Sequence, residues 1–238
     1  MTRRPAAETR EAAARLAPLV SERLEVVRGR IAAAGGDPGS VKVVAVTKTF
    51  GPEAVLAAQA AGLDEVGENY AAELLEKAAQ VQEAGGRPRW HYLGAIQRNK
   101  VGRLAGVVSV WQGLSRAVEA EAIAARAGGE RAAVFVEVNL ATDPHRPGAP
   151  LDEVPGLVRR SLEAGLDVRG LMAVAPRPGS GPSAEEAFGV VARLRSSLRL
   201  EELSIGMTGD LEAAVRAGST MLRVGRALFG PRDPHTAP

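Results

Sequence analysis

Lys48 stands where a lysine side chain could act as a nucleophile. It is one of only four lysines among 30 basic residues, and it directly follows the apolar run VVAVT (43–47). Burial would disfavour the charged ammonium and make the amine more reactive toward a carbonyl carbon, whereas a nearby phosphate would oppose this shift. Schiff-base chemistry is one interpretation of Lys48. The alternative is a lysine that extends past the strand end to pair with Glu68 or another carboxylate.

Two glycine-rich segments near the end of the chain, SIGMTGD (204–210) and RVGRALFG (223–230), have the composition of a phosphate-binding site. In α/β barrels such sites recur after the last two strands, where backbone N–H groups meet the anion. Gly206, Gly209 and Gly225 would allow the backbone to approach closely, although a tight turn also explains each glycine alone. The hydroxyl and guanidinium donors of these segments are Ser204, Thr208, Arg223 and Arg226. Their joint placement favours a phosphate site.

Asn69 and His91 are further candidates for the same site. Asn69, in GENYAAELL (67–75), follows an expected strand, where it could cap the next helix or bond a ligand. His91, in RWHYLG (89–94), faces opposite to its aromatic neighbours and so points either into the barrel or outward. The other histidines, His145 and His235, lie in proline-rich segments, and no two histidines have the spacing of metal ligands. We therefore expect no metal site.

Short β-type runs alternate with helical runs along the chain, which predicts a parallel sheet wrapped by helices. The expected strands are 41–48, 64–68, 89–94, 107–112, 132–140, 167–176, 202–208 and 220–230. Helical stretches begin near Pro52, Tyr70, Gln97, Ser115, Leu151, Ser183 and Asp210, and an amphipathic helix at about 6–34 precedes them. This pattern predicts an α/β fold, a single (β/α)8 TIM-type barrel with an extra N-terminal helix. An open doubly wound sheet is the alternative, but VTKTFGPEAV lacks the G-x-G-x-x-G turn typical of it.

The composition favours one domain over 1–238, with an N-terminal helix (1–36), a barrel (41–230) and a tail (231–238). No apolar stretch reaches the roughly 18 residues of a membrane span, and the charged N-terminus does not resemble a secretory signal, so we expect a soluble, cytoplasmic protein. The absence of cysteine excludes disulfides and cysteine nucleophiles. The 30 basic and 28 acidic residues are interleaved, which argues against a nucleic-acid partner.

Seven motifs, in order, resemble the family of pyridoxal phosphate homeostasis proteins, which is related to the barrel domain of bacterial alanine racemases. The motifs are AVTKTF (45–50), VGENY (66–70), WHYLGAIQRNK (90–100), VEVNL (136–140), RGLMAV (169–174), LSIGMTGDLEAAVRAGST (203–220) and LRVGRALFGPRD (222–233). The resemblance implies that Lys48 holds pyridoxal 5′-phosphate (PLP) as a Schiff base. It also implies the other cofactor contacts: Ser204, Gly206, Gly225 and Arg226 around the phosphate, Arg223 near the cofactor, and Asn69 and His91 beside the ring.

Two positions depart from the family pattern. Arg226 stands where the family commonly has Thr or Ser, and Gly209 where a polar or acidic residue is frequent. The Arg226 guanidinium could add a charge-assisted contact to the phosphate or point outward.

The resemblance implies a carrier or buffer of PLP in vitamin B6 and amino-acid homeostasis, without established turnover. PLP is the expected partner, PLP-dependent apo-enzymes are candidate acceptors, and we expect a monomer and no membrane partner. A racemase needs acid–base groups on both faces of the cofactor, yet neither tyrosine, Tyr70 or Tyr92, is obviously placed as the opposing base, and the chain ends soon after the last strand. The alternatives are a PLP-dependent racemase or lyase, a cofactor-free Schiff-base aldolase, and an interaction protein with an incidental lysine.

Overall fold

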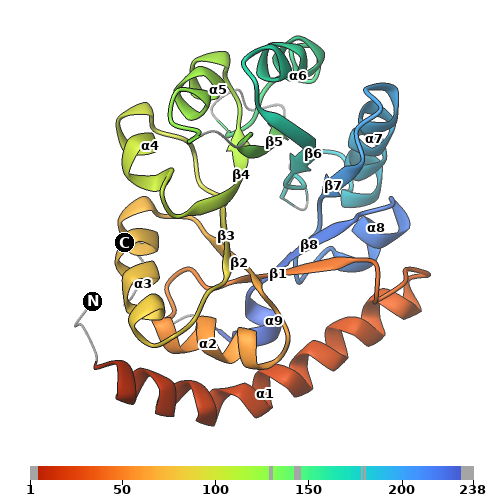
Figure 1. Cartoon of the computed structure of the whole chain (residues 1–238). Coiled ribbons are helices and arrows are strands. Elements are labelled where there is room, and N and C mark those ends of the chain that lie inside the picture. The colour runs from red at the N-terminus through yellow and green to blue at the C-terminus, as the bar shows by residue number, and fades with distance from the viewer. Residues whose placement is uncertain (1–4, 129–130, 142–145, 178, 180, 232–238) are drawn as a thin grey trace.

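The computed structural model describes residues 5–128, 131–141, 146–177, 179 and 181–231. Eight strands form a closed barrel in sequence order, and each strand pairs in parallel with its neighbours (Figure 1). They are β1 (Lys42–Val46), β2 (Glu65–Glu68), β3 (Arg89–Tyr92), β4 (Val108–Leu114), β5 (Ala133–Val138), β6 (Asp167–Ala173), β7 (Glu202–Ser204) and β8 (Met221–Val224). Because β1 also pairs with β8, the sheet has no open edge. The predicted (β/α)8 barrel is confirmed, and the open-sheet alternative is wrong.

Helices surround the barrel and cover the outer face of its strands (Figure 1). They are α1 (Ala6–Ala33), α2 (Pro52–Ala60), α3 (Ala71–Glu83), α4 (Arg98–Leu104), α5 (Ala117–Ala124), α6 (Val154–Glu163), α7 (Ala184–Ser197), α8 (Leu211–Arg216) and α9 (Arg226–Phe229). Local signals explain two helix starts: Pro52 opens α2, where its missing N–H costs nothing, and Ser183 forms a capping box with Glu186 at α7. None of the helices described combines the length and apolar character needed to cross a bilayer.

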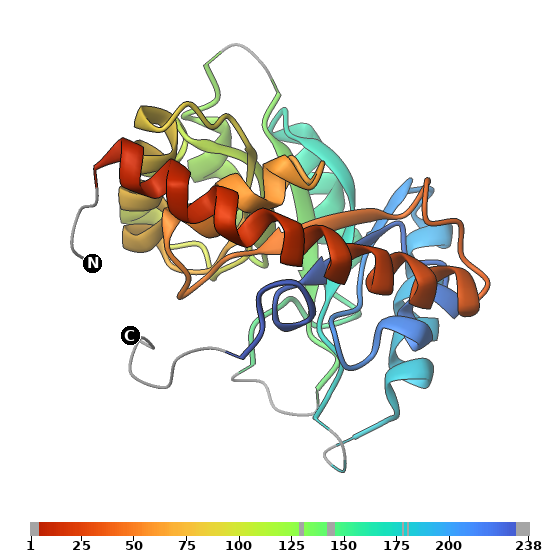
Figure 2. The same ribbon diagram turned by 90° about the horizontal axis from the view of Figure 1, so that it is seen from below.

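The predicted N-terminal helix is present as α1, which lies across the outside of the barrel (Figure 2). It packs mainly on α2 and also contacts α8 and α9. Its apolar stripe, with Val20, Leu24, Val27 and Ile31, is fully buried there. The helix therefore joins the first and last parts of the barrel wall.

The strands alternate between two apolar layers. In β5, Ala133 and Phe135 belong to the cluster inside the barrel, whereas Val134 and Val136 pack outward against the helices. The strands are therefore buried on both faces, as expected for a parallel barrel. The same alternation turns the next odd-numbered residue, Glu137, toward the inside.

The predicted strand at 220–230 is too long. β8 ends at Val224, and the backbone turns at Gly225 into the short helix α9, whose Leu228 and Phe229 N–H groups bond to the Gly225 carbonyl. The apolar residues of RALFG thus pack as one helical turn. The strands predicted at 132–140, 167–176 and 202–208 also end earlier, and the residues after them form loops. Most of the predicted tail, with His235, and also His145, lie outside the described residues.

Candidate functional site

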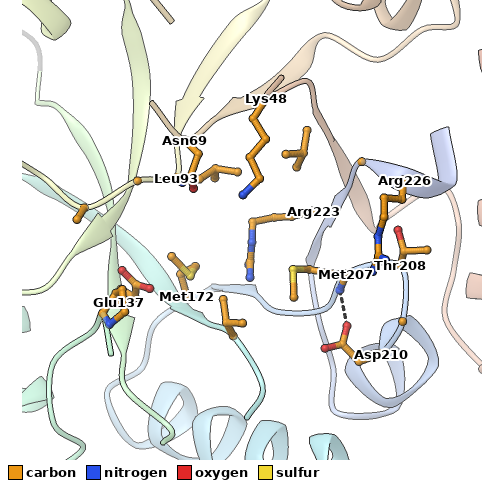
Figure 3. Close-up of a pocket in the computed structure, with 17 residues that line it drawn as sticks. Lys48, Asn69, Leu93, Glu137, Met172, Met207, Thr208, Asp210, Arg223 and Arg226 are labelled. Carbon is orange, nitrogen blue, oxygen red and sulfur yellow. Dashed lines mark hydrogen bonds between the residues drawn. The ribbon is translucent and has the colours of Figure 1, made fainter. Parts of the chain in front are cut away.

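A cavity of about 510 Å³ opens at the carboxyl ends of the barrel strands, which is the usual place of active sites in this fold. Its volume is in the range of small-molecule sites. The charged and polar side chains on its wall are Lys48, Asn69, Glu137, Thr208, Asp210, Arg223 and Arg226. They come from opposite sides of the barrel and converge on one space (Figure 3).

Lys48 follows β1 after one intervening residue, and its amine extends into the cavity toward Arg223 (Figure 3). Glu68, the carboxylate considered as its partner, is fully buried and is bonded elsewhere. Its Oε1 accepts hydrogen bonds from Lys77 Nζ at 2.5 Å and from Thr47 Oγ1 at 2.6 Å, and its Oε2 has no hydrogen-bond partner among the residues described. The structure therefore does not support a Lys48–Glu68 pair.

Asn69 lines the cavity beside Lys48. It does not cap the next helix, because Tyr70 occupies the N-cap position of α3. Gly94 is also on the cavity wall, and a Cβ there would lie 2.1 Å from the Asn69 carbonyl oxygen. Only glycine allows the two backbone segments to approach this closely.

Arg223 is buried in β8, with its guanidinium inside the barrel. Its Nη1 donates to the Ser204 carbonyl at 2.6 Å and to the Ser204 hydroxyl at 2.8 Å, and its Nη2 donates to the Ala173 carbonyl at 2.9 Å. Burial lowers the pKa of Arg223 to about 10, while the charges of Glu137 and Asp210 oppose this shift. Arg223 therefore remains a fixed cation at neutral pH.

Ser204 and His91 are not among the residues that line the cavity; both are buried within the barrel. Ser204 donates to Gln112 Oε1 at 2.7 Å, and the Gln112 amide nitrogen lies 2.7 Å from His91 Nδ1. Because that amide donates, the imidazole proton is assigned to Nε2, which bonds Glu65 at 2.6 Å. A continuous chain of hydrogen bonds thus connects Arg223 with Glu65 through the barrel core.

The loop after β7 carries the predicted phosphate-type residues. Thr208, Gly209 and Asp210 line the cavity, and Asp210 Oδ1 accepts a hydrogen bond from the Met207 N–H at 2.6 Å (Figure 3). Arg30 of α1 donates to the Thr208 carbonyl at 2.9 Å, which ties the loop to the outer helix. The loop is therefore held by hydrogen bonds at the Asp210 carboxylate and at the Thr208 carbonyl.

Two of the predicted glycines have different tasks. Gly206 does not line the cavity; its φ of +93° and a virtual Cβ 2.4 Å from Ala214 Cβ show that it makes a tightly packed turn. Gly225 does line the cavity, and a Cβ there would lie 3.1 Å from the Val46 carbonyl oxygen. Arg226 follows it on the cavity wall with an exposed side chain.

Glu137 is a cavity residue that the motif analysis did not single out. It is 7% exposed, and burial raises its pKa to about 7, assisted by Glu119 and opposed by Arg223 and Arg146. The period of two along AVFVEV could have identified it, because that period places its carboxyl at the inner end of β5. The site therefore holds a carboxyl group that titrates near neutral pH.

The donor set fits an anionic aldehyde. It combines a primary amine, two guanidinium groups, a threonine hydroxyl and a glycine-lined backbone at Gly209, where a Cβ would meet nothing within 4 Å. Amines react with aldehydes, and guanidinium groups and backbone N–H groups bind phosphate. Within the described residues, no cluster of three or more His, Asp or Glu side chains could hold a metal ion.

A model of the alanine racemase N-terminal domain family matches residues 23–233. The pyridoxal phosphate homeostasis protein of Pseudomonas aeruginosa is 36% identical over 226 residues, which cover 90% of this chain and 96% of that protein. The protein of the same name from Deinococcus radiodurans is 37% identical over 206 residues, covering 85% and 95%.

Solved structures agree with this relationship. PipY of Synechococcus elongatus with PLP bound has a TM-score of 0.77 and 29% identity, over 89% of this chain and 100% of that one. Alanine racemase of Corynebacterium glutamicum shares the fold, with a TM-score of 0.66 and 18% identity, over 90% of this chain and 61% of that one.

Proposed function

Since this chain belongs to the alanine racemase N-terminal domain family, we propose that it is a PLP carrier of vitamin B6 and amino-acid homeostasis. One observation carries the proposal: the Lys48 amine points into a cavity whose wall also carries phosphate-type donors (Figure 3). The relatives that are named pyridoxal phosphate homeostasis proteins and match over most of both chains, and PipY with its bound PLP, support it.

The residues of the cavity divide between the two ends of the cofactor. When bound, PLP would supply an aldehyde carbon, and Lys48 is the residue whose amine would hold it. Thr208, Arg226 and the backbone at Gly209 and Gly225 bind the phosphate, because they are the hydroxyl, guanidinium and N–H donors on one part of the wall. Asn69 and Arg223 contact the cofactor from the strand ends.

His91, Ser204 and Gly206 support the cofactor indirectly in this proposal. Ser204 holds the Arg223 guanidinium, and His91 holds Ser204 through Gln112. Gly206 accepts the Arg223 backbone N–H at 3.0 Å and shapes the loop before Thr208. Their contribution is the position of the cationic wall.

Holding rather than turnover is the proposed role, since the relatives are named as homeostasis proteins and not as enzymes. One observation favours a racemase or lyase as the second candidate: Glu137 lines the cavity and has a pKa of about 7. Such a carboxyl could exchange protons at neutral pH.

Absorbance spectra of the wild type and of Lys48→Ala, with and without added PLP, test the carrier proposal. The wild type should show a visible band that Lys48→Ala lacks. A wild type that stays colourless and takes up no added PLP would overturn the proposal. Incubation with L- and D-amino acids tests the second candidate: sustained turnover that depends on Lys48 would replace holding by catalysis.

We also propose that the protein acts as a cytoplasmic monomer that passes PLP to PLP-dependent apo-enzymes. Light scattering after size exclusion measures the oligomeric state. Mixing the PLP-loaded protein with an apo-enzyme tests transfer. The apo-enzyme should be activated faster by the loaded protein than by free PLP at the concentration that the loaded protein releases into solution. Equal rates would contradict direct transfer.

A further inference from the structure

A second lysine, Lys77, lies next to Lys48 but outside the cavity. It belongs to α3, its side chain is 1% exposed, and it is not among the cavity-lining residues. Its Nζ donates to the Thr47 carbonyl at 2.8 Å, to Glu68 Oε1 at 2.5 Å and to Glu73 Oε1 at 2.8 Å. The buried ammonium therefore has an acceptor for each of its three protons.

These contacts hold both peptide groups of Lys48. The carbonyl that Lys77 binds belongs to the peptide joining Thr47 to Lys48. The N–H of the next peptide, which joins Lys48 to Thr49, donates to Glu73 Oε1 at 2.6 Å. The same Glu73 oxygen bonds Lys77. One connected pair of side chains thus fixes the backbone before and after Lys48.

The backbone at Thr49 requires such support. Its φ is +70°, a left-handed conformation that is unfavourable for a β-branched residue. Residues in this region persist where surrounding contacts hold them. The hydrogen bond from the Thr49 N–H to Glu73 is such a contact, and Phe50 N–H closes the turn on the Thr47 carbonyl at 3.0 Å.

Glu68 links this cluster to the next strand. Its carboxyl receives Lys77 and the Thr47 hydroxyl, and Asn69 of the cavity wall follows it directly. Burial raises the pKa of Glu68, while the charge of Lys77 opposes this shift. The ends of β1 and β2 are therefore held relative to each other by groups that do not touch the cavity.

We propose that Lys77 and Glu73 are positioning residues that aim the Lys48 amine at the carbonyl carbon of its ligand. This inference rests on the proposed function, in which the neutral amine adds to the aldehyde carbon, a C=N bond replaces the C=O bond, and the oxygen leaves as water with the two protons of the amine. The rate of such an addition depends steeply on the alignment of nitrogen and carbon. Release of the two peptide groups would let the Lys48 backbone move and would shift the point from which its side chain reaches into the cavity.

Glu73→Ala and Glu73→Gln separate positioning from packing. Glu73 is 15% exposed, so both variants should fold. Alanine removes the acceptor of the Thr49 N–H, whereas glutamine keeps an acceptor oxygen in its place. The rate at which the visible band appears after mixing with saturating PLP, measured by stopped flow, should fall about tenfold or more in Glu73→Ala. Glu73→Gln should retain most of the wild-type rate.

Binding of pyridoxine 5′-phosphate distinguishes positioning from general damage to the cavity. A variant with a damaged cavity would lose affinity for this compound, whereas a variant that only misplaces the Lys48 amine would keep it. The compound lacks the aldehyde, so its affinity reports the cavity without the Lys48 bond. Glu73→Ala should bind it within about twofold of the wild type, since the phosphate contacts remain. Equal loss of pyridoxine 5′-phosphate and PLP, or an unchanged PLP rate, would overturn the inference.

Two further variants complete the test. Lys77→Met should slow the appearance of the visible band in the same way, provided that its circular dichroism matches the wild type. Borohydride reduction should still attach PLP covalently to Lys48 in this variant. Ile123→Ala removes a buried side chain of α5, far from β1 in the ring (Figure 1), and should lower stability without changing the rate. A wild type without a Lys48-dependent band would refute the proposed function itself, which is a different outcome.

Discussion

The Arg223 guanidinium donates a hydrogen bond of 2.8 Å to the hydroxyl of Ser204, inside the barrel. The hydroxyl in turn donates to Gln112 at 2.7 Å, so its lone pair stays directed at the arginine. Ser204, which the family resemblance places at the phosphate, thus also holds the cation of the cavity wall.

Ser204→Ala should destabilise the protein by about 1–3 kcal/mol, because it leaves the buried Gln112 Oε1 without its donor and removes one of the two acceptors of Arg223 Nη1. PLP affinity should fall as well, since the guanidinium loses one of its anchors. Urea unfolding and absorbance titration measure the two effects. Ser161→Ala is the matched control: its hydroxyl bonds the Leu157 carbonyl within α6, so it should lower stability and leave PLP affinity unchanged. Unchanged affinity in both variants would refute this role of Ser204.

Glu137→Gln should change how stability depends on pH. The pKa of Glu137 in the folded protein is about 7, above its ordinary value of 4.5, so the folded state binds more protons than the unfolded state between these values. Wild-type stability should therefore fall as the pH rises through this window and level off above it. The total cost approaches about 3 kcal/mol.

Glutamine cannot ionise, so Glu137→Gln should gain more stability over the wild type at pH 8 than at pH 5. Urea unfolding at the two pH values gives the comparison, with the same buffer ions throughout. A constant difference between variant and wild type would show that Glu137 does not titrate in this range.

Arg226→Ala should weaken PLP binding about three- to tenfold, because an exposed guanidinium on the cavity wall contributes a screened interaction with phosphate. The difference in PLP affinity between the variant and the wild type should be smaller at high salt. Inorganic phosphate should also compete with PLP less strongly in the variant than in the wild type. Arg216→Ala is the control: this exposed arginine pairs with Glu185 and does not line the cavity. If the two variants bind PLP equally well, Arg226 points outward.

Two glycines of one loop should respond differently to alanine. Gly206→Ala should cost more than about 2 kcal/mol of stability, because φ is +93° and the new Cβ would overlap Ala214 and Leu222. Gly209→Ala has open space at the Cβ position and lines the cavity, so it should keep its stability and lose PLP affinity. Thermal unfolding and PLP titration distinguish them, and the reverse pattern would contradict the division of tasks.

The order of short apolar runs was sufficient to predict the barrel, because each run of a parallel barrel is buried on both faces and reads as a strand without tertiary information. Lys48, Asn69 and Arg226 could be placed near one another for the same reason: the carboxyl ends of all the strands meet at one rim. The end of β8 could not be placed, since the apolar letters of RALFG fit a strand and a helical turn equally well.

The side-chain hydrogen bonds inside the barrel could not be predicted from the sequence, because they depend on tertiary packing. Ser204, Gln112 and His91 stand on different strands, and nothing local to any of them specifies that their side chains meet across the core. Lys77 looks in the sequence like an ordinary helical lysine, yet the packing of α3 buries it against the ends of β1 and β2. The order of the apolar runs, with Lys48 after the first of them, was thus enough to predict the barrel and the lysine at its rim, whereas the groups that hold Lys48 are specified by the packing of α3 on the strands. Apolar residues that repeat every 2 residues in a strand or every 3.6 in a helix indicate which face of the element a side chain lies on. A hydrogen bond across the core depends in addition on the relative register of several elements.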